Sequence, residues 1–263
     1  MDSFTGRTVL ITGASSGIGK VFAEKFAEHK ANLILTARRE ENLKSLCADL
    51  AARHHIRADF LACDLAAPEG PKRLHDWVRA GNYKVDLLVN NAGFGGYGRF
   101  ADEPLDTWLK MIQLNVHSLV ELTHLFLPEI KKQRGGIIQI ASTASFQAVP
   151  YLAVYAATKS FVRSFSEALW AENRDIRVFC LCPGNTESEF HAMARIHEKK
   201  VFLRATTEDL VEFGIKAFLK SRSPTKIHGT VNFILASLNR MVPSRTALWF
   251  TRKLYESQEK KHK

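Results

Sequence analysis

Hydrophobic residues along the chain occur in short consecutive runs that alternate with longer stretches of helical periodicity. Positions 33–35 and 87–89 are apolar throughout, which is typical of strands covered by helices on both faces. The runs predict strands at 8–12, 32–37, 57–63, 85–89, 136–141 and 176–182, and a short strand after Pro224. Helices are predicted at 18–29, 41–53, 71–80, 105–127, 152–173, 207–220, 231–238 and 247–255.

Short strands that alternate with helices indicate βαβ units. We therefore predict an α/β fold with a doubly wound parallel sheet of about seven strands and helices on both faces. The hydrophobic content of 46% is enough for a sizeable core, and no linker marks a second unit. The 263 residues are interpreted as a single domain.

The net charge of +10 is concentrated near the C-terminus. From residue 239 onward seven Lys and Arg residues stand against Glu256 and Glu259, a surplus of five and half of the total. Without a recognisable nucleic-acid-binding module, this local charge predicts no nucleic-acid partner. Apolar residues of the same segment, such as Trp249 and Phe250, fit either peripheral contact with an anionic membrane or packing against a neighbouring subunit.

The N-terminus and the cysteines bear on location. Residues 1–7 lack the apolar core of a secretory signal, and no apolar stretch approaches the ~18 residues of a spanning helix. Cys47, Cys63, Cys180 and Cys182 show neither zinc-ligand spacing nor a Cys-x-x-Cys motif. We expect a cytoplasmic protein, since a reducing compartment suits unpaired thiols, and we expect no metal.

A glycine-rich segment from Thr12 to Gly19 follows a predicted strand and opens a predicted helix. In that context glycines permit a tight turn, while the helix N-terminus favours a pyrophosphate. A purely structural turn is the simpler alternative, but the context favours nucleotide binding. The candidate cofactor-binding residues here are Gly13, Ser15, Ser16, Gly17, Ile18 and Gly19.

The end of the second strand bears on the choice of cofactor. NAD sites usually have an acidic residue at this position, whereas a basic residue accommodates a 2′-phosphate. Here Ala37 occupies the acidic position and Arg38 follows it. We predict NADP(H), with Arg38 as the main contact and Ser15 or Arg39 assisting; the alternative is a solvated pair of arginines.

Further candidates follow the third and fourth strands, because ligands bind outside the carboxyl ends of such strands. Asp64 could accept a hydrogen bond from an adenine amino group. Asn91 fits cofactor contact and turn formation equally well. The candidate cofactor residues of these two segments are Asp64, Leu65, Asn91, Ala92 and Gly93.

Tyr155 and Lys159 are four residues apart and therefore share a face of the predicted helix. A free phenol titrates near ~10, and a nearby cation lowers that value toward the range that proton transfer at neutral pH requires. A lone Tyr-x-x-x-Lys is usually an ordinary surface pair. Here the glycine-rich segment in the same chain favours a functional role for the pair.

Taken together, these residues resemble the classical short-chain dehydrogenase/reductase family, in its NADP(H)-preferring type, over residues 7–186. Ser142 precedes Tyr155 by the family's usual interval, whereas the interval of Ser145 differs from it. The motifs are the glycine-rich turn, the Asn90–Gly93 segment, Asn115, Ser142, Tyr155 with Lys159, and Pro183-Gly184 with Thr186. The resemblance implies a single-domain Rossmann fold: residues 1–140 mainly bind cofactor, 141–230 carry catalysis and the substrate loop, and 231–263 are a basic helical extension.

The resemblance also implies roles. Tyr155 exchanges the proton of a carbonyl or alcohol oxygen, Ser142 orients that oxygen, Lys159 lowers the Tyr155 pKa and holds the ribose, and Asn115 supports a water relay. Tyr155 and Lys159 thus also contact the cofactor. The carboxamide end of its nicotinamide ring is placed by Pro183, Gly184 and Thr186. The expected activity is hydride transfer between NADP(H) and a small hydrophobic carbonyl or alcohol. The alternative is a non-catalytic dinucleotide-binding regulatory or scaffold protein.

The family resemblance extends to substrate and assembly. Aromatic side chains near the motifs predict an apolar pocket, and family members place specificity in a segment that corresponds to 185–204. We also expect a homo-oligomer, a dimer or tetramer, through the helices at 105–127 and 152–173. The residues predicted to line the pocket are Phe94, Tyr97, Phe146, Tyr151, Phe190, Met193 and Phe202.

Overall fold

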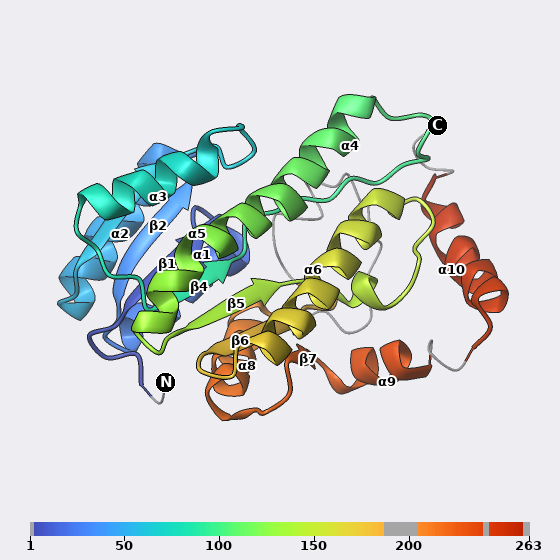
Figure 1. Cartoon of the computed structure of the whole chain (residues 1–263). Helices are drawn as coiled ribbons and strands as arrows, with labels where there is room; N and C mark the ends of the chain where they lie inside the picture. Colours follow the sequence, from blue (N-terminus) through green and yellow to red (C-terminus); the bar gives the residue numbers. More distant parts are fainter. Residues whose placement is uncertain (1–2, 187–204, 239–241, 260–263) are drawn as a thin grey trace.

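The computed structural model describes residues 3–186, 205–238 and 242–259. Its centre is one parallel sheet of seven strands in the order β3-β2-β1-β4-β5-β6-β7 (Figure 1). This order confirms the predicted doubly wound α/β fold. The strands are β1 (Thr8–Thr12), β2 (Asn32–Ala37), β3 (Ala58–Ala62), β4 (Leu87–Asn90), β5 (Gly136–Ile140), β6 (Arg177–Cys182) and β7 (Thr225–Ile227).

Helices cover both faces of the sheet, because successive strand residues point to opposite sides. In β1, Val9 and Ile11 join one core cluster with residues of α1, α2 and α8, while Leu10 joins a second cluster with residues of α3, α5 and α6. The helices are α1 (Gly17–Glu28), α2 (Glu40–His54), α3 (Gly70–Ala80), α4 (Leu105–Ile112), α5 (Leu119–Lys132), α6 (Ala153–Glu172), α8 (Thr207–Lys220), α9 (Thr230–Leu238) and α10 (Ser244–Glu259).

The helix predicted at 105–127 differs from the observed one in two respects. A π-helical segment, η1 (Gln113–Ser118), separates α4 from α5, and α5 continues past Pro128 to Lys132. Residues before a proline usually leave the helical conformation. Here Phe126 and Ile130 on either side of Pro128 are fully buried, so tertiary packing holds the last turn in place.

The strand order reverses between β1 and β4, which are neighbours in the sheet although β2 and β3 lie between them in the sequence. Ligands of such sheets bind at this point, outside the carboxyl ends of the strands. The segments after β1 and β4 are the glycine-rich turn and Asn91–Gly93. The fold thus brings the two predicted cofactor segments to one crevice.

Candidate active site

The glycine-rich turn is held closed by side chains from β1 and the segment after β4. The Asn91 Nδ2 donates to the carbonyl oxygens of Thr12 at 2.9 Å and Gly13 at 3.3 Å. The Thr12 Oγ1 accepts from the backbone nitrogens of Asn91 and Ala92 at 3.0 and 2.9 Å. The Asn91 amide therefore holds the turn closed in this structure.

Thr12 was not among the predicted site residues, although it braces the turn. Its position at the carboxyl end of β1, beside β4, is the signal that could have identified it. Glycine is required at two places next to it. Gly13 has a φ of +67°, and a Cβ on Gly19 would lie 2.6 Å from the Asn91 amide nitrogen and still closer to the Gly13 carbonyl.

The start of α1 fits an anionic group. The Ser16 side chain makes no capping hydrogen bond to the helix, and the first backbone N–H groups of a helix attract negative charge. Arg39 adds a cation, because its guanidinium donates to the hydroxyls of Ser15, at 3.2 Å, and Ser16. Arg38, the predicted main contact, and Arg39 are both exposed after β2, and Arg39 is the arginine that bonds to the turn in this structure.

Two further predicted residues lie near the end of β3. Asp64 is exposed, and its Oδ1 accepts from the Ala66 nitrogen at 3.0 Å. Leu65 is buried, and its carbonyl oxygen accepts from the Ser118 hydroxyl at the end of η1. This contact ties the β3 side of the crevice to the helix that carries Asn115.

Tyr155 and Lys159 lie on α6 and are both buried, with exposed fractions of 8% and 6%. The Lys159 Nζ is 5.9 Å from the centroid of the Tyr155 ring and donates to the carbonyl oxygen of Ile140 at 2.8 Å. Burial lowers the pKa of Lys159 from 10.5 to about 8. The structure thus confines a cation beside the phenol at the end of β5.

Asn115 lies in η1 and is buried. Its Nδ2 donates to the Phe94 carbonyl at 2.9 Å and to the Thr158 hydroxyl at 3.2 Å, and its Oδ1 accepts from the Phe94 nitrogen at 3.1 Å. A Cβ on Gly93 would lie 2.9 Å from that Oδ1 and 3.5 Å from the Lys159 Nζ. Asn115, Gly93 and Lys159 are therefore neighbours, and Thr158 is a bridging residue that the sequence did not single out.

Ser142 directly follows β5 and Ala141, and it caps a short 3₁₀ helix, η2 (Thr143–Phe146). Its Oγ accepts from the Ala144 nitrogen at 3.1 Å. Ser145, the competing serine, is buried with its hydroxyl 3.9 Å from the Cys182 sulfur. Since the Lys159 partner Ile140 is two residues before Ser142, the same strand end positions the hydroxyl and the ammonium.

The segment after β6 carries Pro183, Gly184 and Thr186. The Pro183 carbonyl accepts from the Thr143 nitrogen at 2.8 Å, which joins this segment to η2. Thr186 is buried, its hydroxyl donates to the Gly184 carbonyl at 3.3 Å, and it forms an isolated bridge with Ala205. Residues 187–204, with the predicted Phe190, Met193 and Phe202, lie outside the described part of the chain.

The apolar surroundings of Tyr155 agree with most of the predicted pocket residues. Tyr155 packs in a cluster that also contains Tyr97, Phe94, Tyr151, Trp108, Met111, Val149 and Leu152. Phe146 packs in a different cluster, with its ring 4.3 Å from the Arg163 guanidinium carbon, and it lines a cavity beside α6. The turn of η2 directs Phe146 to another side of α6.

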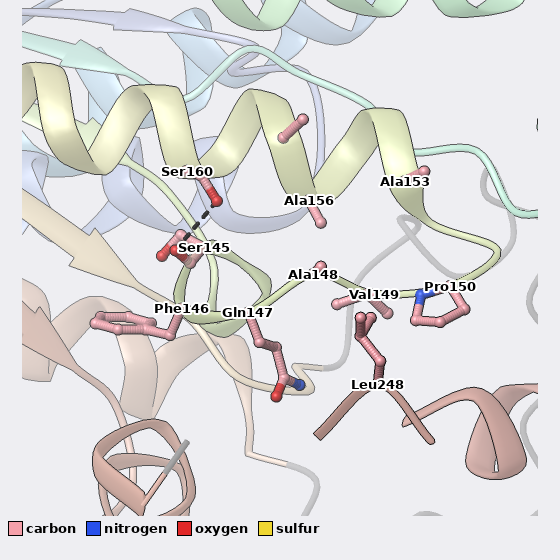
Figure 2. A pocket seen from close by; sticks show the side chains of 11 residues that line it. Ser145, Phe146, Gln147, Ala148, Val149, Pro150, Ala153, Ala156, Ser160 and Leu248 are labelled. Carbon is pink, nitrogen blue, oxygen red and sulfur yellow. Dashed lines mark hydrogen bonds between the residues drawn. The ribbon is translucent and has the colours of Figure 1, made fainter. Parts of the chain in front are cut away.

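On that other side a cavity of about 520 Å³ opens between α6, the 145–150 segment and α10 (Figure 2). Its α6 wall consists of Ala153, Ala156, Ala157 and Ser160, and Leu248 closes it from α10. Val149 and Ala156 line this cavity and also belong to the cluster around Tyr155, so the cavity adjoins the tyrosine site.

Comparison with known proteins identifies the family. A family model for short chain dehydrogenases matches residues 7–199. A short chain dehydrogenase of Pseudocercospora fijiensis is 36% identical over 192 residues, 71% of this chain and 62% of the relative. The serine 3-dehydrogenase of Rhizobium radiobacter is 36% identical over 188 residues, 70% of this chain and 73% of the relative. The human very-long-chain 3-oxoacyl-CoA reductase is 33% identical over 66% of this chain and 57% of its own length.

Solved structures agree with this assignment. A short-chain dehydrogenase from Sphingobium yanoikuyae in complex with NADPH has a TM-score of 0.80 at 29% identity, covering 89% of this chain and 94% of that one. One from Burkholderia phymatum in complex with NAD has a TM-score of 0.80 at 24% identity, covering 90% and 94%, and supports the fold alone. The chain belongs to the short chain dehydrogenase family and is an oxidoreductase of the hydride-transferring type.

Proposed function

We propose that this protein is an NADP(H)-dependent reductase or dehydrogenase that interconverts a hydrophobic carbonyl with its alcohol. The observation that carries the proposal is the buried ammonium of Lys159, 5.9 Å from the Tyr155 ring and bonded to the strand end that leads to Ser142. When bound, NADP(H) supplies the hydride, and the protein supplies position and charge. A non-catalytic protein on this fold has no need of the full set Asn115, Ser142, Tyr155 and Lys159.

In the proposed reaction Tyr155 gives a proton to the carbonyl oxygen during reduction and takes it back during oxidation. Lys159 favours the phenolate between these steps, since a neighbouring cation lowers a phenol pKa. The Ser142 hydroxyl donates to the reacting oxygen and stabilises the charge that develops on it. Asn115 fixes the backbone of Phe94 beside the site and supports proton movement toward Lys159.

The preference for NADP(H) is inferred from charge. Position 37, where NAD enzymes carry an acidic residue, is Ala here, and Arg38 and Arg39 follow it. Arg39 stands at the turn with Ser15 and Ser16, and Arg38 extends the same cationic edge. The backbone cradle at Gly13 and Gly19 fits a pyrophosphate on geometric grounds, with no Cβ in its way.

The substrate class is inferred from the side chains around Tyr155. Tyr97, Trp108, Met111 and Leu152 form an apolar wall next to its ring, which suits a hydrophobic carbonyl better than a charged one. The named relatives act on molecules as different as serine and very-long-chain 3-oxoacyl-CoA, so they set no single substrate.

A panel of ketones and aldehydes, graded in apolar size and matched with the corresponding alcohols, tests the reaction directly. We expect NADPH absorbance to fall with the ketones in proportion to the alcohol formed, and faster with apolar members than with charged ones. If no carbonyl or alcohol changes the absorbance while NADPH still binds, the enzymatic proposal is wrong. That result would favour the alternative, a non-catalytic dinucleotide-binding regulatory or scaffold protein.

We also propose a homo-oligomer formed by α4, α5 and α6. The outer surface of α4 exposes Leu105, Leu109 and Ile112, and α6 exposes Phe161. Contiguous exposed apolar side chains on paired helices usually mark a protein interface. Light scattering after size exclusion should give a dimer or tetramer, and Leu109→Asp should shift it toward monomer; an unchanged mass for the variant would contradict this surface.

Finally, we propose a reducing, cytoplasmic environment. Cys47, Cys63, Cys180 and Cys182 are free and buried, although the sulfurs of Cys180 and Cys182 are only 3.9 Å apart. Unpaired neighbouring thiols suit a compartment that keeps them reduced. Separately, no helix among the described residues has both the length and the apolar character needed to cross a membrane. A tagged chain found outside the cytoplasm would contradict the proposed location.

A further inference from the structure

The C-terminal part of the structure exposes an unusual share of apolar surface. Nine of the fourteen large apolar side chains that are exposed among the described residues lie between residues 231 and 250. They include Phe233 and Leu235 on α9 and Trp249 and Phe250 on α10, with exposed fractions between 52% and 62%. We call α9 together with residues 242–253 the C-terminal arm; it lies beyond the β7 edge of the sheet in Figure 1.

The first helix of the arm, α9, is apolar on nearly all sides. Its nine residues carry no charge, and Ala236 alone among them is buried. A helix that is apolar all round normally lies in a protein core or in lipid. In this structure α9 is on the surface, and most of its apolar side chains stay exposed among the residues that the structure describes.

The charge around the arm identifies the kind of partner. From residue 213 to residue 255 the sequence contains no Asp or Glu but eight Lys and Arg residues, at 216, 220, 222, 226, 240, 245, 252 and 253. On α10, Arg245, Arg252 and Lys253 are exposed among the apolar side chains. Glu256 at the end of this stretch pairs with Arg252 at 3.7 Å. The arm thus offers an anionic partner both apolar contact and an excess of positive charge.

The two sides of α10 differ in what they contact. Leu248 points toward Val149 and Pro150 and closes the cavity beside α6 (Figure 2). Trp249 is exposed, stacks edge-on with Phe250 at 4.8 Å and carries the Lys253 ammonium 4.1 Å from its ring centroid. Trp with a neighbouring Lys is the combination that anchors proteins at the boundary between lipid and water.

We propose that the C-terminal arm binds the surface of an anionic lipid bilayer, with the side chains of α9 and the Trp249–Phe250 pair inserted among the lipids. The cations at 245, 252 and 253 then face the lipid headgroups. A second copy of the chain fits this surface less well, because a two-fold interface would bring the same acid-free cationic segments together. The inference does not depend on the proposed reaction.

Co-sedimentation with vesicles tests the binding. The full chain should pellet with phosphatidylcholine–phosphatidylglycerol vesicles and not with phosphatidylcholine alone, and high salt should weaken the association. Trp249→Ser with Phe250→Ser should abolish it. Each cation contributes about five-fold near an anionic surface, so replacing the three cations Arg245, Arg252 and Lys253 by Gln should weaken binding roughly a hundredfold.

The matched control replaces Lys44, Arg79 and Lys84 by Gln, which removes the same charge from the exposed surface near the opposite, β3 edge of the sheet. This control should pellet like the unmodified chain. NADPH oxidation with a water-soluble ketone should persist in the Trp249→Ser/Phe250→Ser variant, so that a failed reaction and a failed membrane contact are distinguishable.

Three results would overturn the proposal. The first is no pelleting with anionic vesicles. The second is an equal loss of vesicle binding in the control and in the variant that replaces Arg245, Arg252 and Lys253. Binding would then depend on the net charge of the whole protein and not on the arm. The third is a smaller oligomer for Trp249→Ser/Phe250→Ser together with no vesicle binding by the unmodified chain, which would assign the arm to an interface between copies.

Discussion

The ammonium nitrogen of Lys159 lies 5.9 Å from the centroid of the Tyr155 ring, and both side chains are buried. The nitrogen also donates to the Ile140 carbonyl at 2.8 Å. Burial lowers the pKa of Lys159 to about 8, so the folded chain bears a free-energy cost to keep a cation there at neutral pH. Strongly perturbed groups that cluster in this way are typical of functional sites.

Replacing Tyr155 with Phe removes the phenolic hydroxyl and keeps the packing of the ring. Turnover should fall by at least the ~10² expected for loss of a general acid, while the dissociation constant for NADPH stays unchanged. Steady-state kinetics and fluorescence titration measure the two quantities. Tyr83→Phe, at a ring that stacks on Trp77, is the matched control. Full turnover in Tyr155→Phe would assign the proton to another group.

Lys159→Met should stabilise the cofactor-free protein at pH 7 and inactivate it. Below about pH 8 the Lys is charged in both the folded and the unfolded chain, and the folded chain bears the whole cost of burial, on the order of 3 kcal/mol. Between about 8 and 10.5 only the unfolded chain keeps the proton, so the stability of the unmodified protein rises with pH.

Urea unfolding at pH 7 and at pH 10 measures this effect. The stability advantage of Lys159→Met should be largest at pH 7 and shrink at pH 10, whereas Lys84→Met, at an exposed position, should show no such pH dependence. A variant that is less stable than the unmodified chain at pH 7 would show that the bond to Ile140 outweighs the cost of desolvation.

Much of the fold could be predicted because its periodicities are local. Apolar runs at 33–35 and 87–89 fall inside β2 and β4, as expected for strands covered on both faces. The π-helical segment at Gln113–Ser118 and the continuation of α5 past Pro128 could not be predicted in this way. Both depend on partners distant in sequence, such as Phe94 for Asn115 and the core around Ile130.

In the candidate site, too, local spacing could be predicted from the sequence and contacts between distant residues could not. Spacing alone placed Tyr155 and Lys159 on one helix, and the structure adds the bond to Ile140 and the depth of burial that lowers the Lys159 pKa. The sequence predicted Arg38 as the main cofactor contact with Arg39 assisting, whereas Arg39 bonds to the turn in this structure, since the backbone path from β2 into α2 decides which arginine reaches it. The sequence also could not show that Phe146 packs in a different cluster from Tyr155, because both clusters bring together residues distant in sequence.

Arg38→Asp should shift the cofactor preference toward NADH. A hydrogen bond to a charged group contributes about 1.5–3 kcal/mol, so the ratio of kcat/KM for NADPH to that for NADH should fall roughly ten- to a hundred-fold. Lys44→Asp makes the same charge change at an exposed position of α2 and should leave the ratio unaltered. If the unmodified enzyme uses NADH as efficiently as NADPH, the assignment of NADP(H) is wrong.

Gly19→Ala tests the cofactor cradle by filling it. The added Cβ would lie 2.6 Å from the Asn91 amide nitrogen and closer to the Gly13 carbonyl, so the turn must shift and the dissociation constant for NADPH should rise roughly tenfold or more. Gly6→Ala is the control: its φ of +72° makes the variant strained by about 1–2 kcal/mol, but Gly6 precedes the amino end of β1, at the far end of that strand from the turn. Calorimetric titration with thermal unfolding separates the outcomes, because both variants should lose stability and only Gly19→Ala should lose affinity. Equal affinity in the two would place the pyrophosphate away from this turn.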